Sequence, residues 1–210
     1  MIKSDKLNVT TFFENAKKSI VLTEDRKQLL SKIATAITNE LTERNKLNLN
    51  FICTHNSRRS QLGQVWAFFA AEYFNLNIQS FSGGTETTAF HRNTVKTLQH
   101  VGFDFNVIDF SHQNPKYAIG FKGTDNTIMG YSKKFDDEAN EYPYIAITTC
   151  GHADENCPFI PDAIHRFHMP FVDPKRSDNK PEQNETYLET NKQIAGEIFI
   201  IFEEIVKQIQ

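Results

Sequence analysis

This 210-residue chain has few cysteines and no long apolar run. Its three cysteines are Cys53, Cys150 and Cys157, and an odd, low number argues against a structural disulfide framework. No apolar stretch approaches the ~20 residues that a membrane span needs. The opening segment, MIKSDKLNVTTFFENAKK, lacks the apolar core and cleavage site of a secretory signal. We therefore expect a cytoplasmic protein without a membrane partner, in which each cysteine is either a buried apolar residue or chemically active.

The chain also lacks an excess of charge of one sign. Its net charge is −3, which predicts no broad attraction to nucleic acid, although a local basic pocket is compatible with that figure. Core material is plentiful, because 39% of the residues are hydrophobic and 18 are phenylalanine. This composition is typical of one large globular domain, with or without an appendage.

The first 45 residues differ in character from the rest. Thr23 and the acidic residues after it have the composition of a helix N-cap and first turn. Apolar residues then recur at helical spacing: Leu29, Leu30, Ile33, Ile37 and Leu41. With a shorter helix over residues 10–19, this predicts a helical N-terminal extension (1–45) beside a main domain (46–210). We expect the extension to pack on the main domain, and a partner interface is the alternative.

From residue 47 the pattern changes to alternating strands and helices. Strands are predicted at LNFIC, NIQSFSGG, YPYIAITT and AIHRFHMP, and helices over 61–73, over 90–102 up to Gly102, and at the C-terminus. The segment KYAIGFKGTDNTIMGYSKKF has two extended runs around a polar turn, which predicts a β-hairpin inserted before the YPYIAITT strand. Such alternation favours an α/β fold with a central parallel sheet.

Three chemically interesting segments fall at one edge of this predicted sheet. Cys53 ends the first strand, Cys150 follows the YPYIAITT strand, and FVDP follows the last strand. In open α/β sheets, ligands bind at the carboxyl ends of the strands. We therefore expect these segments to meet at a common site.

The loop after Cys53 has the features of an anion site. A strand-to-helix loop directs several backbone N–H groups to one place, next to the positive end of the helix dipole, and favours the thiolate form of a cysteine there. The planar guanidinium of Arg59 could hold two oxygens of a tetrahedral oxyanion. Asn56, Ser57 and Ser60 add short polar groups. On these grounds alone, Cys53 is either a core residue at a strand end or a nucleophile.

The loop sequence CTHNSRRSQ resembles that of the low-molecular-weight tyrosine phosphatases, and more closely that of the thioredoxin-coupled arsenate reductases, which share their fold. The resemblance continues through SGGTE, NPKYAIGF, YSKKF, TTCGHADENCPFIP and FVDP, and covers roughly residues 47–210. A pair of extra cysteines separates the reductases from the phosphatases, and Cys150 and Cys157 match that pair. The resemblance implies a three-layer, low-molecular-weight tyrosine phosphatase-like fold and arsenate reductase activity.

The resemblance also implies a role for each site residue. Cys53 would attack the arsenic of bound arsenate, and Asp173 would protonate the departing oxygen. The oxyanion would be held by Arg59 and the other loop residues: Thr54, His55, Asn56, Ser57, Arg58 and Ser60. Cys150 would then attack Cys53, and Cys157 would attack Cys150, by thiolate–disulfide exchange, leaving a disulfide for thioredoxin to reduce. This relay requires residues 151–156 to rearrange.

Three positions bear on the choice between reductase and phosphatase. His55 stands where the family usually has glycine, so a backbone position suited to unusual angles carries a side chain. Arg58 stands where a further cysteine is usual, and either adds charge near the oxyanion or points into solvent. Lys175 follows the Asp173-Pro174 pair where the phosphatases usually have tyrosine, which favours the reductase.

No metal ion is assigned to the expected site. Some reductases of this family bind potassium near the loop asparagine, and Asn56 and Ser82 match part of that site, but Gln64 replaces an acidic ligand. A zinc site would have to draw on other residues: Cys150, His152, Cys157, and His165 or His168. Structural zinc ligands usually include a close pair such as Cys-x2-Cys, which this chain lacks.

Three hypotheses of function follow, of which the first is an arsenate reductase with a three-cysteine relay. The second is a low-molecular-weight protein tyrosine phosphatase that hydrolyses phosphotyrosine or small phosphoesters. It would need only Cys53, Arg59 and Asp173 and would form a phosphocysteine intermediate. The third is a non-catalytic oxyanion-binding module, which the intact Cys, Arg and Asp set disfavours. The sequence leaves the oligomeric state open.

Overall fold

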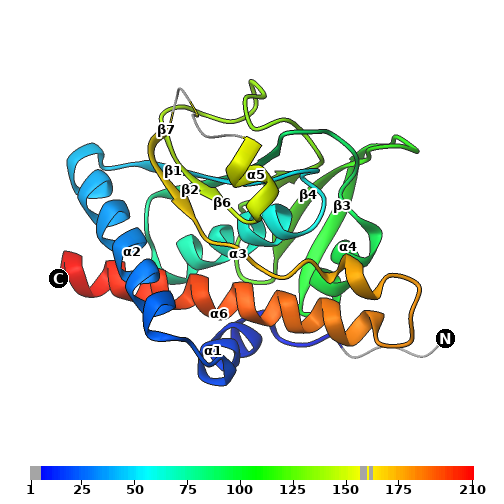
Figure 1. Cartoon of the computed structure of the whole chain (residues 1–210), viewed down its shortest axis with the longest axis horizontal. Coiled ribbons are helices and arrows are strands. Elements are labelled where there is room, and N and C mark those ends of the chain that lie inside the picture. The colour runs from blue at the N-terminus through cyan, green and yellow to red at the C-terminus, as the bar shows by residue number, and fades with distance from the viewer. Residues whose placement is uncertain (1–5, 157–159, 161–162) are drawn as a thin grey trace.

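The computed structural model describes residues 6–156, 160 and 163–210, and shows an α/β fold (Figure 1). Its helices are α1 (Val9–Ser19), α2 (Glu24–Arg44), α3 (Arg59–Phe74), α4 (Arg92–His100), α5 (Gly151–Asn156), η1 (Pro174–Ser177, a 3-10 turn) and α6 (Gln183–Ile209). Its strands are β1 (Leu47–Cys53), β2 (Ile78–Gly84), β3 (Phe103–Asp109), β4 (Lys116–Phe121), β5 (Ile128–Gly130), β6 (Tyr144–Thr148) and β7 (Ala163–His168). None of the helices in the described ranges is long and apolar enough to cross a membrane.

The central sheet is parallel, as the sequence predicts. Its four strands run in the order β2-β1-β6-β7, and every neighbouring pair is parallel. Strand β1 is buried along its whole length. Helix α3 approaches β1 closely at Gly63, where a Cβ atom would stand only 2.4 Å from the Phe51 ring. Glycine at this position therefore lets α3 follow β1 directly, which fixes the loop between them.

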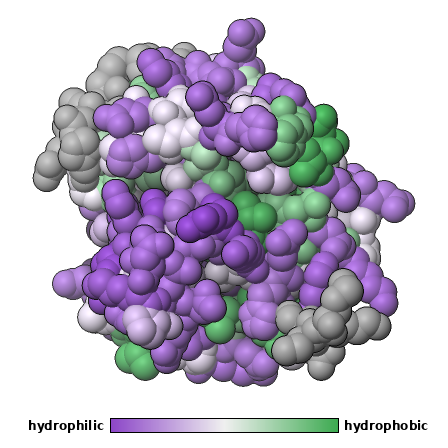
Figure 2. All heavy atoms as spheres, turned by 90° about the vertical axis from the view of Figure 1, so that its right-hand side faces the viewer, coloured by the Kyte–Doolittle hydropathy of each residue, from purple (hydrophilic) through white to green (hydrophobic). Residues whose placement is uncertain are grey.

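A second, antiparallel sheet carries the predicted hairpin. Strands β4 and β5 pair as expected, but β3 pairs with the other side of β4, so the unit has three strands. We predicted no strand over Phe103–Asp109. Its inner end is buried at Phe103, whereas Val107 and Ile108 are exposed, so its apolar pattern reaches beyond the core. The face of the molecule in Figure 2 likewise shows a limited hydrophobic area within a mainly hydrophilic surface.

The N-terminal helices pack on the rest of the chain. Figure 1 shows α6 running beneath the sheet, with α1 below it and α2 towards its C-terminal end. Phe13 of α1 is fully buried, and its ring centroid lies 5.5 Å from that of Trp66 and 4.8 Å from that of Phe199. The expected packing is confirmed for α1 and α2, and a domain boundary at residue 46 stays a prediction.

The aromatic contacts of Phe13 give a test of this packing. We expect Phe13→Ala to lower the free energy of unfolding by about 3–5 kcal/mol, because it leaves a cavity against Trp66 and Phe199. Val21→Ala is the matched control, since Val21 is 98% exposed and its loss should change little. Denaturant unfolding of both variants measures the difference. Equal small effects would mean that α1 is not part of the core.

Candidate active site

Cys53 lies at the carboxyl end of β1, at the base of the loop that leads into α3. Its side chain is buried, with 4% of its surface exposed, and Sγ lies 3.0 Å from the Ser60 hydroxyl. Asn56 donates from Nδ2 to the same hydroxyl at 2.9 Å. In the contact between Cys53 and Ser60, either the thiol or the hydroxyl can be the donor. The sulfur therefore lies among polar groups, which is unlike the surroundings of a purely structural apolar side chain.

The loop presents unused backbone donors. Within the described part of the chain, the N–H groups of residues 55–58 have no protein acceptor. The loop carbonyls, in contrast, are tied to neighbouring segments, because Ser132 and Thr88 both donate from their hydroxyls to the His55 carbonyl, at 2.9 and 3.1 Å. Free amides held in place by such outer contacts are the kind of donor that an anion site uses.

The strained backbone position of this loop is Asn56, not His55. Asn56 has φ +46°, in the left-handed region that asparagine tolerates, whereas His55 is not among the positive-φ residues. The sequence prediction of unusual angles at His55 is therefore wrong. Gly84 makes the close approach in this region, since a Cβ there would stand 2.8 Å from the Asn56 nitrogen. The side chain of His55 faces Glu86, at 3.3 Å.

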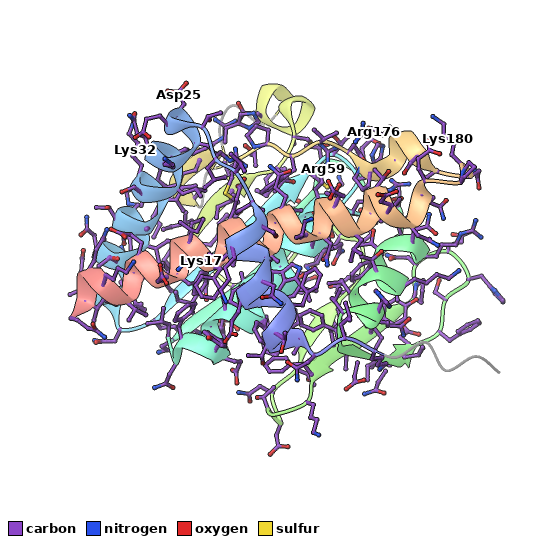
Figure 3. The ribbon with its side chains drawn as sticks, turned by 90° about the horizontal axis from the view of Figure 1, so that it is seen from below. Lys17, Asp25, Lys32, Arg59, Arg176 and Lys180 are labelled. Atoms are coloured by element: carbon purple, nitrogen blue, oxygen red, sulfur yellow. The ribbon has the colours of Figure 1, made fainter. Side chains whose placement is uncertain are left out.

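Arg59 and Asp173 form an ion pair over the loop. Arg59 donates from Nη2 to the Asp173 carboxylate at 2.7 Å and from Nη1 to the Phe171 carbonyl at 3.0 Å. Figure 3 shows Arg59 within the outline of the molecule beside α6, while Arg176 and Lys180 lie at its edge. Cys53, Arg59 and Asp173 line a common pocket of about 10 Å³, which is room for one water. Both terminal nitrogens of Arg59 are in use, so we expect the ion pair with Asp173 to open when an oxyanion binds to them.

Arg58 also lines this pocket, and its side chain is only 12% exposed. Its Nη2 pairs with Asp178 at 2.7 Å, and its Nε donates to the Tyr187 hydroxyl at 2.7 Å. The alternative that Arg58 points into solvent is therefore wrong, whereas its charge does lie close to the expected oxyanion site. Asp178 and Tyr187 escaped the sequence analysis because they lie 120 and 129 positions away from Arg58 in the chain, so no local motif links them.

The parallel pairing of β1 and β6 brings two of the three cysteines together. Ile52 lies opposite Thr148, and the Thr149 amide donates to the Ile52 carbonyl at 2.7 Å. Cys53 and Cys150 therefore follow adjacent strand ends and belong to one small buried cluster. Cys150 is 4% exposed, and its sulfur lies 3.5 Å from the Thr54 hydroxyl. Cys157 lies outside the described residues.

Asn56 and Ser82, which match part of the family's potassium site, have protein partners in the structure. Asn56 Oδ1 accepts from the Lys133 amide at 2.9 Å, and the Ser82 hydroxyl donates to Gln64 Oε1 at 2.7 Å. Because these oxygens have protein partners, we derive no step through potassium. Among the described residues no three His, Cys, Asp or Glu side chains are grouped as a metal site needs. Two of the histidines considered for zinc, His165 and His168, contact Glu40 and Thr148.

The ion pair of Asp178 with Arg58 predicts that the stability of the protein depends on pH. Burial raises the pKa of Asp178, but the hydrogen bond from Tyr187 and the charge of Arg58 outweigh burial and leave that pKa below its ordinary value. Its contribution to stability is therefore present above about pH 4 and lost as the pH falls through the lowered pKa. We expect Asp178→Asn to be less stable than wild type at neutral pH. Urea unfolding should show this difference narrowing as the pH falls below about 4. A constant difference would contradict the assignment.

No protein-family model matches the chain, but individual proteins do. The YwlE arginine phosphatase, in a mutant form with a phosphorylated active-site serine, superposes with a TM-score of 0.52 at 13% identity. The match covers 77% of this chain and 97% of that one. Together with the parallel sheet and the loop after β1, this likeness defines the fold as that of the low-molecular-weight tyrosine phosphatases.

The sequence relatives narrow the assignment. An arsenate reductase of Halalkalibacterium halodurans is 30% identical over 139 residues, which are 66% of this chain and 82% of that protein. One of Bacillus subtilis is 28% identical over 146 residues, 70% of this chain and 87% of the relative. The chain belongs to the arsenate reductase family.

Proposed function

We propose that this protein reduces arsenate to arsenite through Cys53, Cys150 and Cys157, with thioredoxin as the external reductant. The observation that carries the proposal is the meeting of two buried cysteines, Cys53 and Cys150, at adjacent strand ends under a loop of free amides. A phosphatase needs only the first of these thiols. The family resemblance supports thioredoxin as donor, and the reducing cytoplasm is where such a relay would be recycled.

The first step of the proposed reaction uses the loop. Arsenate is held by Arg59 and the amides of residues 55–58, and the Cys53 thiolate forms a bond to arsenic. One hydroxyl group of the arsenate leaves as water after receiving a proton from Asp173. The free donors surround the place where negative charge gathers, so they stabilise the transition state without rearranging.

The second step transfers the electrons. The Cys150 thiolate attacks the Cys53 sulfur, the sulfur–arsenic bond breaks, and its electron pair stays on arsenic, which leaves as arsenite. A Cys53–Cys150 disulfide remains. The Cys157 thiolate then attacks Cys150, which releases Cys53 as a thiolate and moves the disulfide to Cys150–Cys157. A dithiol such as thioredoxin reduces the Cys150–Cys157 disulfide and restores both thiols.

Phosphatase activity of the same site is the second candidate. Cys53, Arg59 and Asp173 line one pocket and form the set that phosphoester hydrolysis through a phosphocysteine needs. This reading leaves Cys150 and Cys157 without a role in turnover. The two candidates therefore differ in their dependence on these two cysteines.

The Cys157→Ser variant separates the two candidates. Wild type and variant are compared with arsenate plus reduced thioredoxin, and separately with an aryl phosphate. We expect arsenate reduction by the variant to stop after about one equivalent, because the oxidation cannot leave Cys150, while any phosphoester hydrolysis persists. Sustained arsenate turnover by the variant would contradict the relay, and hydrolysis without arsenate reduction in wild type would establish the phosphatase. Circular dichroism of both proteins excludes a folding defect.

A further inference from the structure

Two consecutive arginines reach the two ends of the η1 turn. Arg59 pairs with Asp173, the residue before η1, and Arg58 pairs with Asp178, the residue after it, both at 2.7 Å. The Asp173 carboxylate also caps the turn, since it accepts from the Lys175 amide at 3.0 Å. The loop is therefore joined to η1 by two separate ion pairs. Asp173, the proposed acid, belongs to the first of them.

The pair formed by Arg58 is the more enclosed of the two. The side chains of Arg58 and Asp178 are 12% and 20% exposed, against 38% for Asp173. Tyr187 of α6 connects both partners, because its hydroxyl accepts from Arg58 and donates to Asp178 Oδ1 at 2.7 Å. Asn93 adds a donor to the same carboxylate at 3.3 Å. Hydrogen bonds of this kind make a partly buried pair stiffer than an exposed one.

Further charged and titratable groups face this network. His91 of the α4 N-terminus lies 3.8 Å from Asp178 and 3.2 Å from the Tyr187 hydroxyl. Burial, followed by the charge of Arg58, lowers the pKa of His91, so its imidazole is neutral at pH 7. Burial raises the pKa of Tyr187 to about 12. The pair thus keeps one cation and one anion through the neutral range.

The pair formed by Arg59, in contrast, has to open during the reaction. Asp173 occupies Nη2 of Arg59 at 2.7 Å, so an oxyanion held by the guanidinium fork takes that nitrogen from Asp173. When it does so, η1 loses one of its two ties to the loop. Without a second contact, Asp173 could then move away from the loop during the step in which it donates its proton.

We propose that Arg58 is a positioning residue, whose pair with Asp178 keeps η1 and its Asp173 over the loop while the oxyanion occupies Arg59. The proposal rests on the oxyanion-binding function argued above. It gives a role to a residue that replaces the cysteine usual at this position in the family. Arg59 changes partner in each cycle, whereas Arg58 does not.

Hydrogen exchange of the η1 amides tests this without any ligand. The Asp178 amide, which donates to the Lys175 carbonyl at 3.0 Å, reports whether the turn is held. Arg59→Met imitates the loss of the first tie, and Arg58→Met removes the second. We expect each single variant to keep the protection, and Arg58→Met/Arg59→Met to lose it by about 10-fold or more. Arg92→Met, at an exposed arginine of α4, is the matched control. Loss in Arg59→Met alone, or full protection in the double variant, would overturn the proposal.

A second comparison keeps the test decisive if the double variant does not fold. Wild type and Arg58→Met are each measured with and without saturating inorganic phosphate. Phosphate should leave the η1 amides protected in wild type and lower their protection about 10-fold in the variant, and Arg58→Lys should restore part of it. Equal protection in both proteins with phosphate bound would overturn the proposal. Protection of Cys53 from iodoacetamide reports phosphate binding independently. If phosphate gives no such protection, the oxyanion function fails, and the ligand-free variants still decide the role of Arg58.

Discussion

Cys53→Ser is expected to abolish arsenate reduction, and any phosphoester hydrolysis with it, by about 10⁴-fold or more. A serine hydroxyl stays protonated at neutral pH, and no base lies beside it, since the contact of Cys53 within the described residues is the Ser60 hydroxyl. The expected loss lies in the chemical step. Arsenate-dependent oxidation of thioredoxin, followed at saturating arsenate, measures it.

Binding gives the control for this variant. Cys53→Ser keeps the amides of residues 55–58 and the Arg59 guanidinium, so we expect its affinity for phosphate, measured by calorimetry, to stay within a few-fold of wild type. Cys150→Ser is the matched variant at the neighbouring strand end. In this variant, iodoacetamide should still alkylate Cys53, and phosphate should still slow that alkylation. Residual arsenate turnover in Cys53→Ser above about 1% of wild type would show that another thiol is the nucleophile.

Arg59→Lys is expected to have the second largest effect, a fall in kcat/KM for arsenate of about 10²–10³-fold. Lysine keeps the charge but lacks the planar fork, and the structure shows that Arg59 uses both terminal nitrogens at once, one towards Asp173 and one towards the Phe171 carbonyl. A single ammonium cannot make both contacts or hold two oxygens of an oxyanion. Steady-state kinetics at varied arsenate concentration separates the loss in kcat from the rise in KM.

Arg92→Lys is the control for the charge-conserving change, because Arg92 is exposed at the start of α4. We expect it to match wild type. The kcat/KM of Arg58→Lys should lie between those of Arg92→Lys and Arg59→Lys, since Arg58 is paired with Asp178 and holds the turn that carries Asp173. Equal kinetics for Arg59→Lys and wild type would mean that the loop amides alone bind the substrate.

The parts of the fold that could be predicted are those in which the pattern of apolar residues within one segment indicates its secondary structure. The strands of the central sheet alternate along the chain with segments of helical pattern, and this alternation predicts the parallel sheet correctly. Strand β3 was missed because only its first residue is deeply buried, so its alternation of Phe103, Phe105 and Val107 extends onto the surface. The pairing of β3 with β4 is a tertiary contact, and the sequence pattern of neither segment predicts it.

The candidate site also has residues that could be predicted from the sequence and contacts that could not. Cys53, Arg59 and Asp173 could be chosen from the sequence because the edge where parallel strands end is a general site for ligands, and all three line one pocket in the structure. The partner of Arg58 could not be chosen, because Asp178 comes close only when η1 and α6 fold back over the loop. The backbone angle at Asn56 likewise follows from the geometry of the loop, whereas the comparison with family sequences pointed to His55.

The disulfide that forms in Cys157→Ser after one equivalent of arsenate tests the central claim most directly. The reaction is stopped with acid, remaining thiols are alkylated, and the peptides are mapped by mass spectrometry while arsenite is counted. The account predicts one arsenite per chain and a bond between Cys53 and Cys150, whose strand ends are adjacent in the sheet. Arsenite formed with both cysteines still alkylated, or no arsenite from a folded protein that binds phosphate, would contradict it.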